Sequence, residues 1–287
     1  MAPTVKYMGM YDFVPSKAAA IAFGILFLIT TLLHLFQLVH KRTWFYIPFL
    51  IGCLFEAIGY MTRAKSATQY PDYDLGPEVI QYILILVAPA LLAASIYMEF
   101  GRLIIMTDGD RFCFIRRTWL TKIFVIGDII SFLAQFSGGA MLANDTTASK
   151  GQNIMKVGVV VQLLFFGVFI ATIIVFNMRL SKQGSRTKHI VPWKKHIVAL
   201  YCTGILILIR SIFRLIEFVE STDGPLSRYE WLSYVFDAVL ILITCVILNY
   251  IHPGEIKRYI KAVQSPIGGF EMDRRHDHGA LYTSMED

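Results

Sequence analysis

This chain of 287 residues has little of the charge that a water-soluble protein needs. Charged residues make up 17% of it and apolar residues 55%, and the mean hydropathy is +0.55. Such a composition lies outside the range of soluble globular domains. Between the long apolar segments only short loops remain, followed by a C-terminal tail. We therefore expect no separate soluble domain, and we expect the protein to act within or beside a membrane.

The motifs of several membrane-protein classes are also missing. Without a phosphate-cradling GxxxxGK[ST] sequence, the chain is not an ATP-driven pump by itself. No His-x-x-x-His or His-Glu-x-x-His pattern accompanies His34 or His252, which argues against an intramembrane zinc hydrolase. The last apolar segment contains no lysine for a retinal Schiff base. These absences predict a protein that is not an enzyme and that has no metal site and no cofactor.

Cysteine is scarce and poorly placed for disulfides. Cys53, Cys202 and Cys245 lie within apolar segments, and Cys113 lies in a basic loop. None of the four is expected on an oxidising face, so we predict no disulfide bond. The start of the chain also lacks the pattern of a cleavable signal peptide, so the first apolar segment is interpreted as a retained signal anchor.

Seven apolar stretches are each long enough to cross a bilayer as a helix. A helix rising 1.5 Å per residue needs about 20 residues to cross about 30 Å of hydrocarbon. The predicted spans are 18–39, 44–62, 78–106, 120–143, 154–178, 197–219 and 231–251. The predicted fold class is all-α, a polytopic transmembrane seven-helix bundle. It comprises a short outer segment (1–17), the transmembrane domain (18–252) and a cytosolic tail (253–287).

The basic residues outside the spans predict the orientation of the bundle. Sixteen lysines and arginines fall in the loops and tail on one side, and six fall on the other. Because basic loops stay in the cytosol, we expect the N-terminus outside and the C-terminus inside. The tail is predicted to start with a short interfacial helix and to be disordered from Ser265. Asn144 begins an N-glycosylation triplet in a short outer loop.

Charged residues inside the predicted spans are the main functional signal. They include Glu56, Glu99, Arg102, Asp128, Arg210, Arg214, Glu217 and Asp237. A charge facing lipid costs several kcal/mol, so these side chains should face the bundle interior or a wet cavity.

The spacing of these charges groups most of them into two polar layers. Arg210, Arg214 and Glu217 project from one helix face, and depth counting places Asp237 and Glu56 at a similar level. These five form a predicted outer layer, with Gln135 expected a little below it, and Asp128 and the Glu99/Arg102 pair are expected near the inner half of the membrane. Such groups either pair as interhelical staples or line an amphipathic cavity open to the outer leaflet. The sequence leaves both alternatives open.

Several separated motifs follow one another along the chain. The first is Glu56-Ala-Ile-Gly-Tyr60-Met-Thr-Arg63, followed by Asp128-Ile-Ile-Ser131 with Gln135. Later come Arg210-Ser-Ile-Phe-Arg214-Leu-Ile-Glu217, then Glu230-Trp231, Tyr234 and Asp237, and finally His252-Pro253-Gly254. In this order the motifs resemble the fungal lipid-translocating exporter family, also called RTA-like. The resemblance covers roughly residues 11–255 and leaves out the tail.

The resemblance implies a protein that translocates amphipathic, lipid-like compounds, such as sphingoid bases or sterol-like drugs, and confers resistance to them. The implied partners are membrane lipids and an amphipathic small molecule, with no nucleic acid, and the implied location is the plasma membrane. A seven-helix receptor or sensor of lipid or stress signals is the alternative function. The motif positions that become candidate substrate-binding or gating residues are Glu56, Tyr60, Arg63, Asp128, Gln135, Arg210, Arg214, Glu217, Tyr234 and Asp237.

Overall fold

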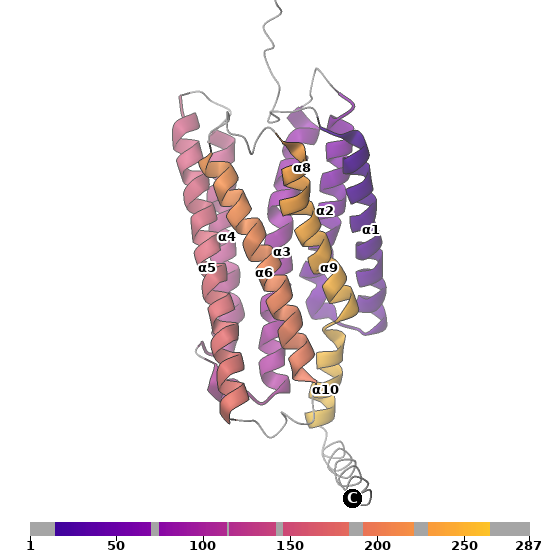
Figure 1. The fold of residues 1–287 in the computed structure, drawn as a ribbon, viewed down its shortest axis with the longest axis vertical. Helices are drawn as coiled ribbons and strands as arrows, with labels where there is room; N and C mark the ends of the chain where they lie inside the picture. Colours follow the sequence, from indigo (N-terminus) through magenta and orange to yellow (C-terminus); the bar gives the residue numbers. More distant parts are fainter. Residues whose placement is uncertain are drawn as a thin grey trace, which may run out of the picture.

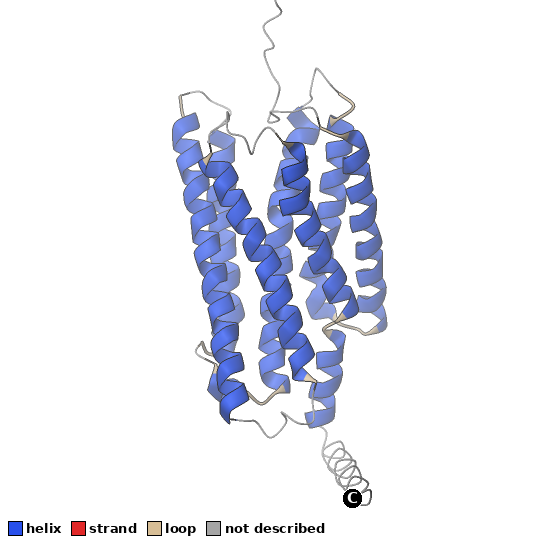
Figure 2. Cartoon of the chain, in the orientation of Figure 1, coloured by secondary structure: helices blue, strands red, loops and turns tan. Residues whose placement is uncertain are grey.

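The computed structural model describes residues 15–69, 75–113, 115–141, 146–183, 192–220 and 229–264. Within these ranges the chain is helical and contains no strand (Figure 2). Seven helices are long and apolar enough to span a membrane, which confirms the predicted all-α, seven-helix class. The predicted glycosylation position Asn144 and the tail from Ser265 lie outside the described residues.

The helices follow the predicted spans, and α3, α5 and α6 extend several residues beyond them. The first six spans are α1 (Lys17–His40), α2 (Ile47–Ser66), α3 (Leu75–Met106), α4 (Arg117–Met141), α5 (Ala148–Gln183) and α6 (Trp193–Val219). The seventh consists of α8 (Glu230–Ser233), the π-helical segment η3 (Tyr234–Val239) and α9 (Leu240–Tyr250). Short 3₁₀ turns, η1 (Trp44–Tyr46) and η2 (Asp110–Phe112), precede α2 and α4. The spans of α3, α5 and α6 were predicted too short because the polar ends of a helix lack the apolar signal.

The helices form a bundle in which sequential neighbours pack together, and α9 returns to α1 (Figure 1). Helix α3 contacts α2, α4, α6 and α10 (Gly254–Gln264), so it lies at the centre. The end of the bundle at the start of α1 is called the N-terminal end here. The opposite end, which carries the predicted cytosolic loops and α10, is called the basic end.

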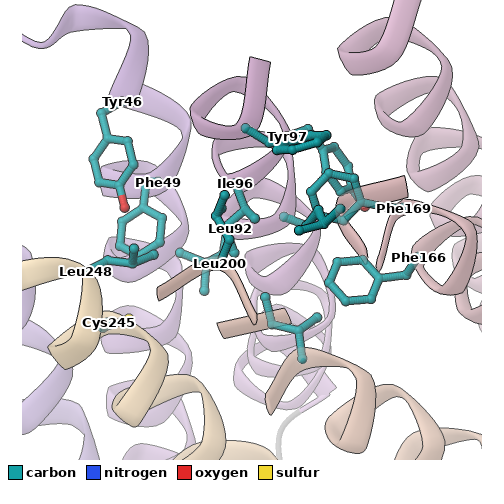
Figure 3. Packing of buried hydrophobic residues seen from close by; sticks show 14 of the residues in the cluster. Tyr46, Phe49, Leu92, Ile96, Tyr97, Phe166, Phe169, Leu200, Cys245 and Leu248 are labelled. Carbon is teal, nitrogen blue, oxygen red and sulfur yellow. The ribbon is translucent and has the colours of Figure 1, made fainter. Parts of the chain in front are cut away.

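Large apolar side chains occupy both the interior and the outer surface. Phe36 and Leu164 are more than 60% exposed although both lie within spans, as expected for side chains that meet lipid. Inside, Leu92 and Ile96 of α3 lie between an aromatic group around Tyr97 and a second group around Phe49 (Figure 3). The interior is therefore packed by side chains on both sides of α3.

Glycines allow α4 and α5 to approach closely. A Cβ atom on Gly138 would lie 2.6 Å from the backbone oxygen of Gly151, and one on Gly158 would lie 2.9 Å from that of Ser131. Small residues at such contacts are typical of membrane helix pairs. Gly139, by contrast, would meet only the Tyr82 ring at 3.8 Å, an ordinary contact. Gly138 therefore serves the close packing of α4 on α5, whereas Gly139 does not.

The first part of the tail is a helix, as its apolar spacing predicts. Helix α10 begins after the bend at Pro253 and packs against the end of α3, where Ile256 is fully buried. Lys257 donates to the backbone oxygen of Arg42 at 2.6 Å. These contacts attach α10 to the basic end of the bundle.

Candidate functional site

Asp237 is the centre of a buried charge cluster near the N-terminal end. It lies in the π-helical segment η3, where the wider helical turn interrupts the seventh span. Its two carboxylate oxygens accept separately from Arg210 and from Arg214, both on α6. Asp237 is 3% exposed, so these ion pairs are closed to water. The cluster therefore joins the sixth span to an irregular turn of the seventh.

Arg210 also bonds to a backbone group that a proline has left free. Pro89 lies inside α3 and has no N–H, so the carbonyl of Ile85, four residues earlier, lacks its helical donor. The Nη2 atom of Arg210 donates to this carbonyl at 3.1 Å. One guanidinium thus links α3, α6 and the seventh span.

Arg214 continues the cluster along α6. Its Nη1 donates to Glu217 at 3.1 Å, the i, i+3 neighbour on the same helix face. Glu56 of α2 is within electrostatic range of Asp237 and of both arginines and is 1% exposed. Its Oε1 atom has no hydrogen-bond partner among the described residues. The structure thus brings together all five residues of the predicted outer layer.

A second pair lies next to the cluster at the N-terminal end. Arg63 of α2 donates to Glu230 of α8 at 3.1 Å and lies 5.1 Å from the centre of the Tyr234 ring. The backbone N–H of Ser16 donates to the same Glu230 carboxylate at 2.8 Å. Tyr60 and Tyr234 lie with their ring centres 6.0 Å apart. Tyr60, Arg63 and Tyr234 therefore pack together between the charge cluster and the N-terminal end of the bundle.

Two candidate residues lie apart from the cluster. Asp128 accepts from the Tyr97 hydroxyl at 2.9 Å, within the aromatic group between α3, α4 and α5. Gln135 donates to Gln162 at 3.0 Å, across the α4–α5 contact. The sequence predicted only their depth; in the bundle they also lie to one side of the cluster, because α4 packs against α3 and α5 rather than against the α6 face that carries the arginines.

Glu99 and Arg102 have different neighbours and do not act as a pair. The Glu99 side chain is completely buried and lies 3.8 Å from Nδ1 of His196 on α6. Arg102 is instead stacked over the Phe45 ring, with 3.7 Å from its guanidinium carbon to the ring centre. Residues three apart point in similar directions, but the available partners separate these two.

A groove of about 250 Å³ lies between α1 and α2. Its lining consists of Gly24, Leu28, Leu54, Ala57, Ile58, Met61, Thr62 and Lys65. No residue of the charge cluster lines it, and its walls are almost entirely apolar. This groove is therefore not the amphipathic cavity that the sequence left open as one alternative. Arg210, Arg214, Asp237 and Glu217 do pair with one another, as the staple alternative predicts, whereas Oε1 of Glu56 has no hydrogen-bond partner among the described residues.

The described residues hold no group of three or more His, Cys, Asp or Glu side chains suited to a metal ion. His34 and His252 do lie near each other, with ring centres 6.4 Å apart. However, His34 bonds to the Cys245 carbonyl at 3.1 Å, and His252 accepts from the backbone N–H of Gly254 at 3.0 Å. These contacts explain the two histidines as packed polar side chains.

Sequence reasoning missed three participants in these contacts. The Ile85 carbonyl could have been found from Pro89, because a proline inside a helix always frees the carbonyl four residues before it. Glu230 was noted only within the family motif Glu230-Trp231; it lies at a helix start, where acidic residues are common, so the sequence gave no signal of its pairing with Arg63. His196 lies just before the predicted span 197–219, so it was not among the charged or titratable residues expected inside the membrane.

A seven-helix bundle with a closed arginine–carboxylate cluster across α2, α3, α6 and the seventh span defines a polytopic integral membrane protein. The chain belongs to the family described as "RTA1 like protein", which it matches over residues 49–259. This confirms the family resemblance noted from the sequence motifs.

Three curated fungal relatives show the extent of the similarity. Protein RTM1 of Saccharomyces cerevisiae is 34% identical, covering 83% of this chain and 89% of its own length. The probable lipid transporter atnI of Emericella nidulans is 32% identical, covering 86% and 67%. The sphingoid long-chain base transporter RSB1 of Saccharomyces cerevisiae is 25% identical, covering 86% and 73%. No solved structure matches the chain.

Proposed function

We propose that this protein moves amphipathic, lipid-like compounds across the membrane and that a cationic headgroup binds at Glu56. The observation that carries the proposal is the imbalance of the charge cluster. Two guanidinium groups, of Arg210 and Arg214, face three carboxyl groups, of Glu56, Glu217 and Asp237. Asp237 and Glu217 are bonded to the arginines, whereas Oε1 of Glu56 finds no partner in the part of the chain that the structure describes.

An unsatisfied buried carboxyl is costly unless a donor reaches it. A protonated amine supplies both a positive charge and three N–H donors, so it would complete the cluster. The hydrocarbon part of such a molecule would remain among the apolar side chains or in lipid. The names of two relatives, a sphingoid long-chain base transporter and a probable lipid transporter, support an amphipath of this class.

Tyr60, Arg63 and Tyr234 would gate this site in our proposal. They lie between the cluster and the N-terminal end, and the Arg63–Glu230 pair must open before a headgroup passes that way. Asp128 and Gln135 would support the α4–α5 side of the bundle without touching the headgroup. We place the protein in the plasma membrane and assign it transport without catalysis. A fluorescent fusion imaged beside a plasma-membrane marker tests the location.

Reconstituted liposomes test the activity. A fluorescent sphingoid-base analogue is added, and its movement between leaflets is followed by quenching from one side. Glu56→Gln should slow movement at least about tenfold, equivalent to about 1.4 kcal/mol of headgroup binding. Asp110→Asn removes an exposed carboxyl at the basic end and serves as the matched control.

An N-acylated analogue of the same chain length lacks the cationic amine and should move slowly in every variant. Equal movement in protein-containing and empty liposomes would contradict the transport proposal. Protein-dependent movement that is unchanged in Glu56→Gln would leave transport standing but reject Glu56 as the headgroup site.

A further inference from the structure

Three acid–base side chains form a row at the basic end of the bundle. The ring of His196 lies between two carboxylates: its Nδ1 is 3.8 Å from Glu99 on α3, and its Nε2 is 3.8 Å from Glu255 on α10. The two nitrogens therefore face carboxylates on opposite sides of the ring. This arrangement is separate from the charge cluster around Asp237.

The three groups differ sharply in exposure. The side chains of Glu99 and His196 are completely buried, whereas the Glu255 side chain is 36% exposed. Both oxygens of Glu99 lack a hydrogen-bond partner among the described residues. The row thus runs from a carboxyl at the surface to an unsatisfied carboxyl inside α3.

Residues of the neighbouring elements contact the two carboxylates at the ends of this row. Lys195, next to His196 on α6, donates to Glu255 and fixes the outer carboxylate. On the inner side, the titratable group facing Glu99 besides His196 is Tyr46 of η1, whose hydroxyl is buried without a partner in the described part of the chain. Helix α10 contributes Glu255 because it packs against α3.

From this geometry we propose that Glu255, His196 and Glu99 form a proton relay between the basic-end surface and the membrane interior. An imidazole can accept a proton at one nitrogen and release another from the opposite nitrogen. The two 3.8 Å distances are longer than a hydrogen bond. Small side-chain rotations would shorten them, or waters would bridge them.

The relay conserves the proton count at each step. Protonated Glu255 gives its proton to Nε2 of a His196 ring that carries a proton on Nδ1. The resulting imidazolium releases the Nδ1 proton to Glu99, which becomes a neutral carboxylic acid. The ring keeps the proton on Nε2, and transfer of that proton back to the Nδ1 position by tautomer exchange resets it. One proton has then moved from the surface to Glu99.

A pH-jump experiment on the reconstituted full-length protein tests the relay. Infrared difference spectroscopy follows the C=O stretch of a buried carboxylic acid after a photoacid releases protons. The band should be absent in Glu99→Gln, which assigns it. In His196→Ala the band should still form, but at least about tenfold more slowly, since a positioned acid–base group contributes 10²–10⁴-fold to proton transfer. Added imidazole should restore the rate.

Glu255→Gln changes an exposed position and should show the same slowing even if the buried His196 variant folds poorly. Asp110→Asn, also acidic and at the basic end, should behave as wild type. Equal rates in wild type, His196→Ala and Glu255→Gln would overturn the relay, as would the absence of any band that depends on Glu99. The measurement follows a proton and not a lipid, so its failure leaves the proposed transport untouched.

Discussion

Asp237 binds two arginines at once, and this makes it the most sensitive single residue of the charge cluster. Asp237→Asn would leave Arg210 and Arg214 buried with one negative charge fewer. Removing one partner of a buried ion pair costs about 3–5 kcal/mol, so we expect a loss of stability of that size. Thermal unfolding of the purified protein in detergent measures it.

The matched control for this prediction is Asp110→Asn. Asp110 pairs with Arg117 at 3.3 Å on an exposed surface, with a side chain 58% exposed. Such a pair contributes about 0–1 kcal/mol, so this variant should unfold close to wild type. Equal losses of stability in the two variants would contradict a larger contribution of Asp237 to the stability of the fold.

Cys113 should react slowly although it lies outside the membrane-spanning helices. Burial, assisted by the Asp110 carboxylate and opposed by Arg179, raises the pKa of its thiol to about 12. Because the thiolate is the nucleophile, its population at pH 8 falls roughly a thousandfold below that of an ordinary cysteine. Alkylation by a membrane-impermeant maleimide should therefore be slow and should accelerate as pH rises toward 12.

The reference for Cys113 is the same cysteine in protein denatured by detergent, measured at the same pH. A native rate equal to the denatured rate would show that the thiol is open to solvent. The three other cysteines lie in α2, α6 and α9, so an impermeant reagent should discriminate against them.

At the scale of elements, Pro89 and Arg210 should be energetically coupled. In Pro89→Ala the new N–H can bond the Ile85 carbonyl, which removes the acceptor that Arg210 now uses. Arg210→Lys should then cost less in the Pro89→Ala background than in wild type. A coupling of about 0.5–1.5 kcal/mol, one hydrogen bond, is expected from a double-mutant cycle on unfolding.

Pro48 supplies the control for this cycle. It lies at the start of α2, where the missing N–H has no helical acceptor in any case. The cycle of Pro48→Ala with Arg210→Lys should therefore show coupling near zero. Equal coupling for the two prolines would reject the proposed link between α3 and α6.

Adjacent glycines on α4 should respond differently to one added methyl group. Gly138→Ala forces a Cβ to within 2.6 Å of a backbone oxygen that cannot rotate away, and overpacking of this kind costs about 1–3 kcal/mol. Gly139→Ala meets an ordinary contact and gains helix propensity, so it should be neutral or slightly stabilising. Unfolding of the two variants side by side checks the contrast, and equal losses would contradict the α4–α5 packing described here.

For the whole molecule, the sequence was enough to predict the helices and part of the site. Long apolar runs impose helices in lipid, because only internal hydrogen bonds satisfy the backbone there. Depth counting correctly brought together Glu56, Arg210 and Asp237, since helix rise and chain direction fix the level of a residue. It could not show which helices are neighbours, and so it did not reveal that Asp128 and Gln135 lie on the α4–α5 side of the bundle, apart from the arginines.

Pairing across helices was the other feature that residue counting could not provide. Glu99 and Arg102 share a helix face, yet they contact different residues from other segments. Glu99 lies near His196, and Arg102 stacks on the Phe45 ring. The π-helical turn at Asp237 is likewise set by packing, because nothing in Tyr234–Val239 breaks the helical pattern. These details depend on which partners the folded bundle places within reach.

The direction of the bundle in the membrane follows from charge and can be tested at both ends. The excess of basic residues at the basic end predicts that this end faces the cytosol. In a cysteine-free background, Thr68→Cys at the N-terminal end should be labelled on intact cells by an impermeant maleimide. Asp110→Cys should be labelled only after the membrane is opened. Both positions are exposed in the structure, so a failure to react cannot be blamed on burial. The opposite pattern would place the charge cluster toward the cytosolic leaflet and the Glu255–His196–Glu99 row toward the outside, and protons would then enter the relay from the external medium.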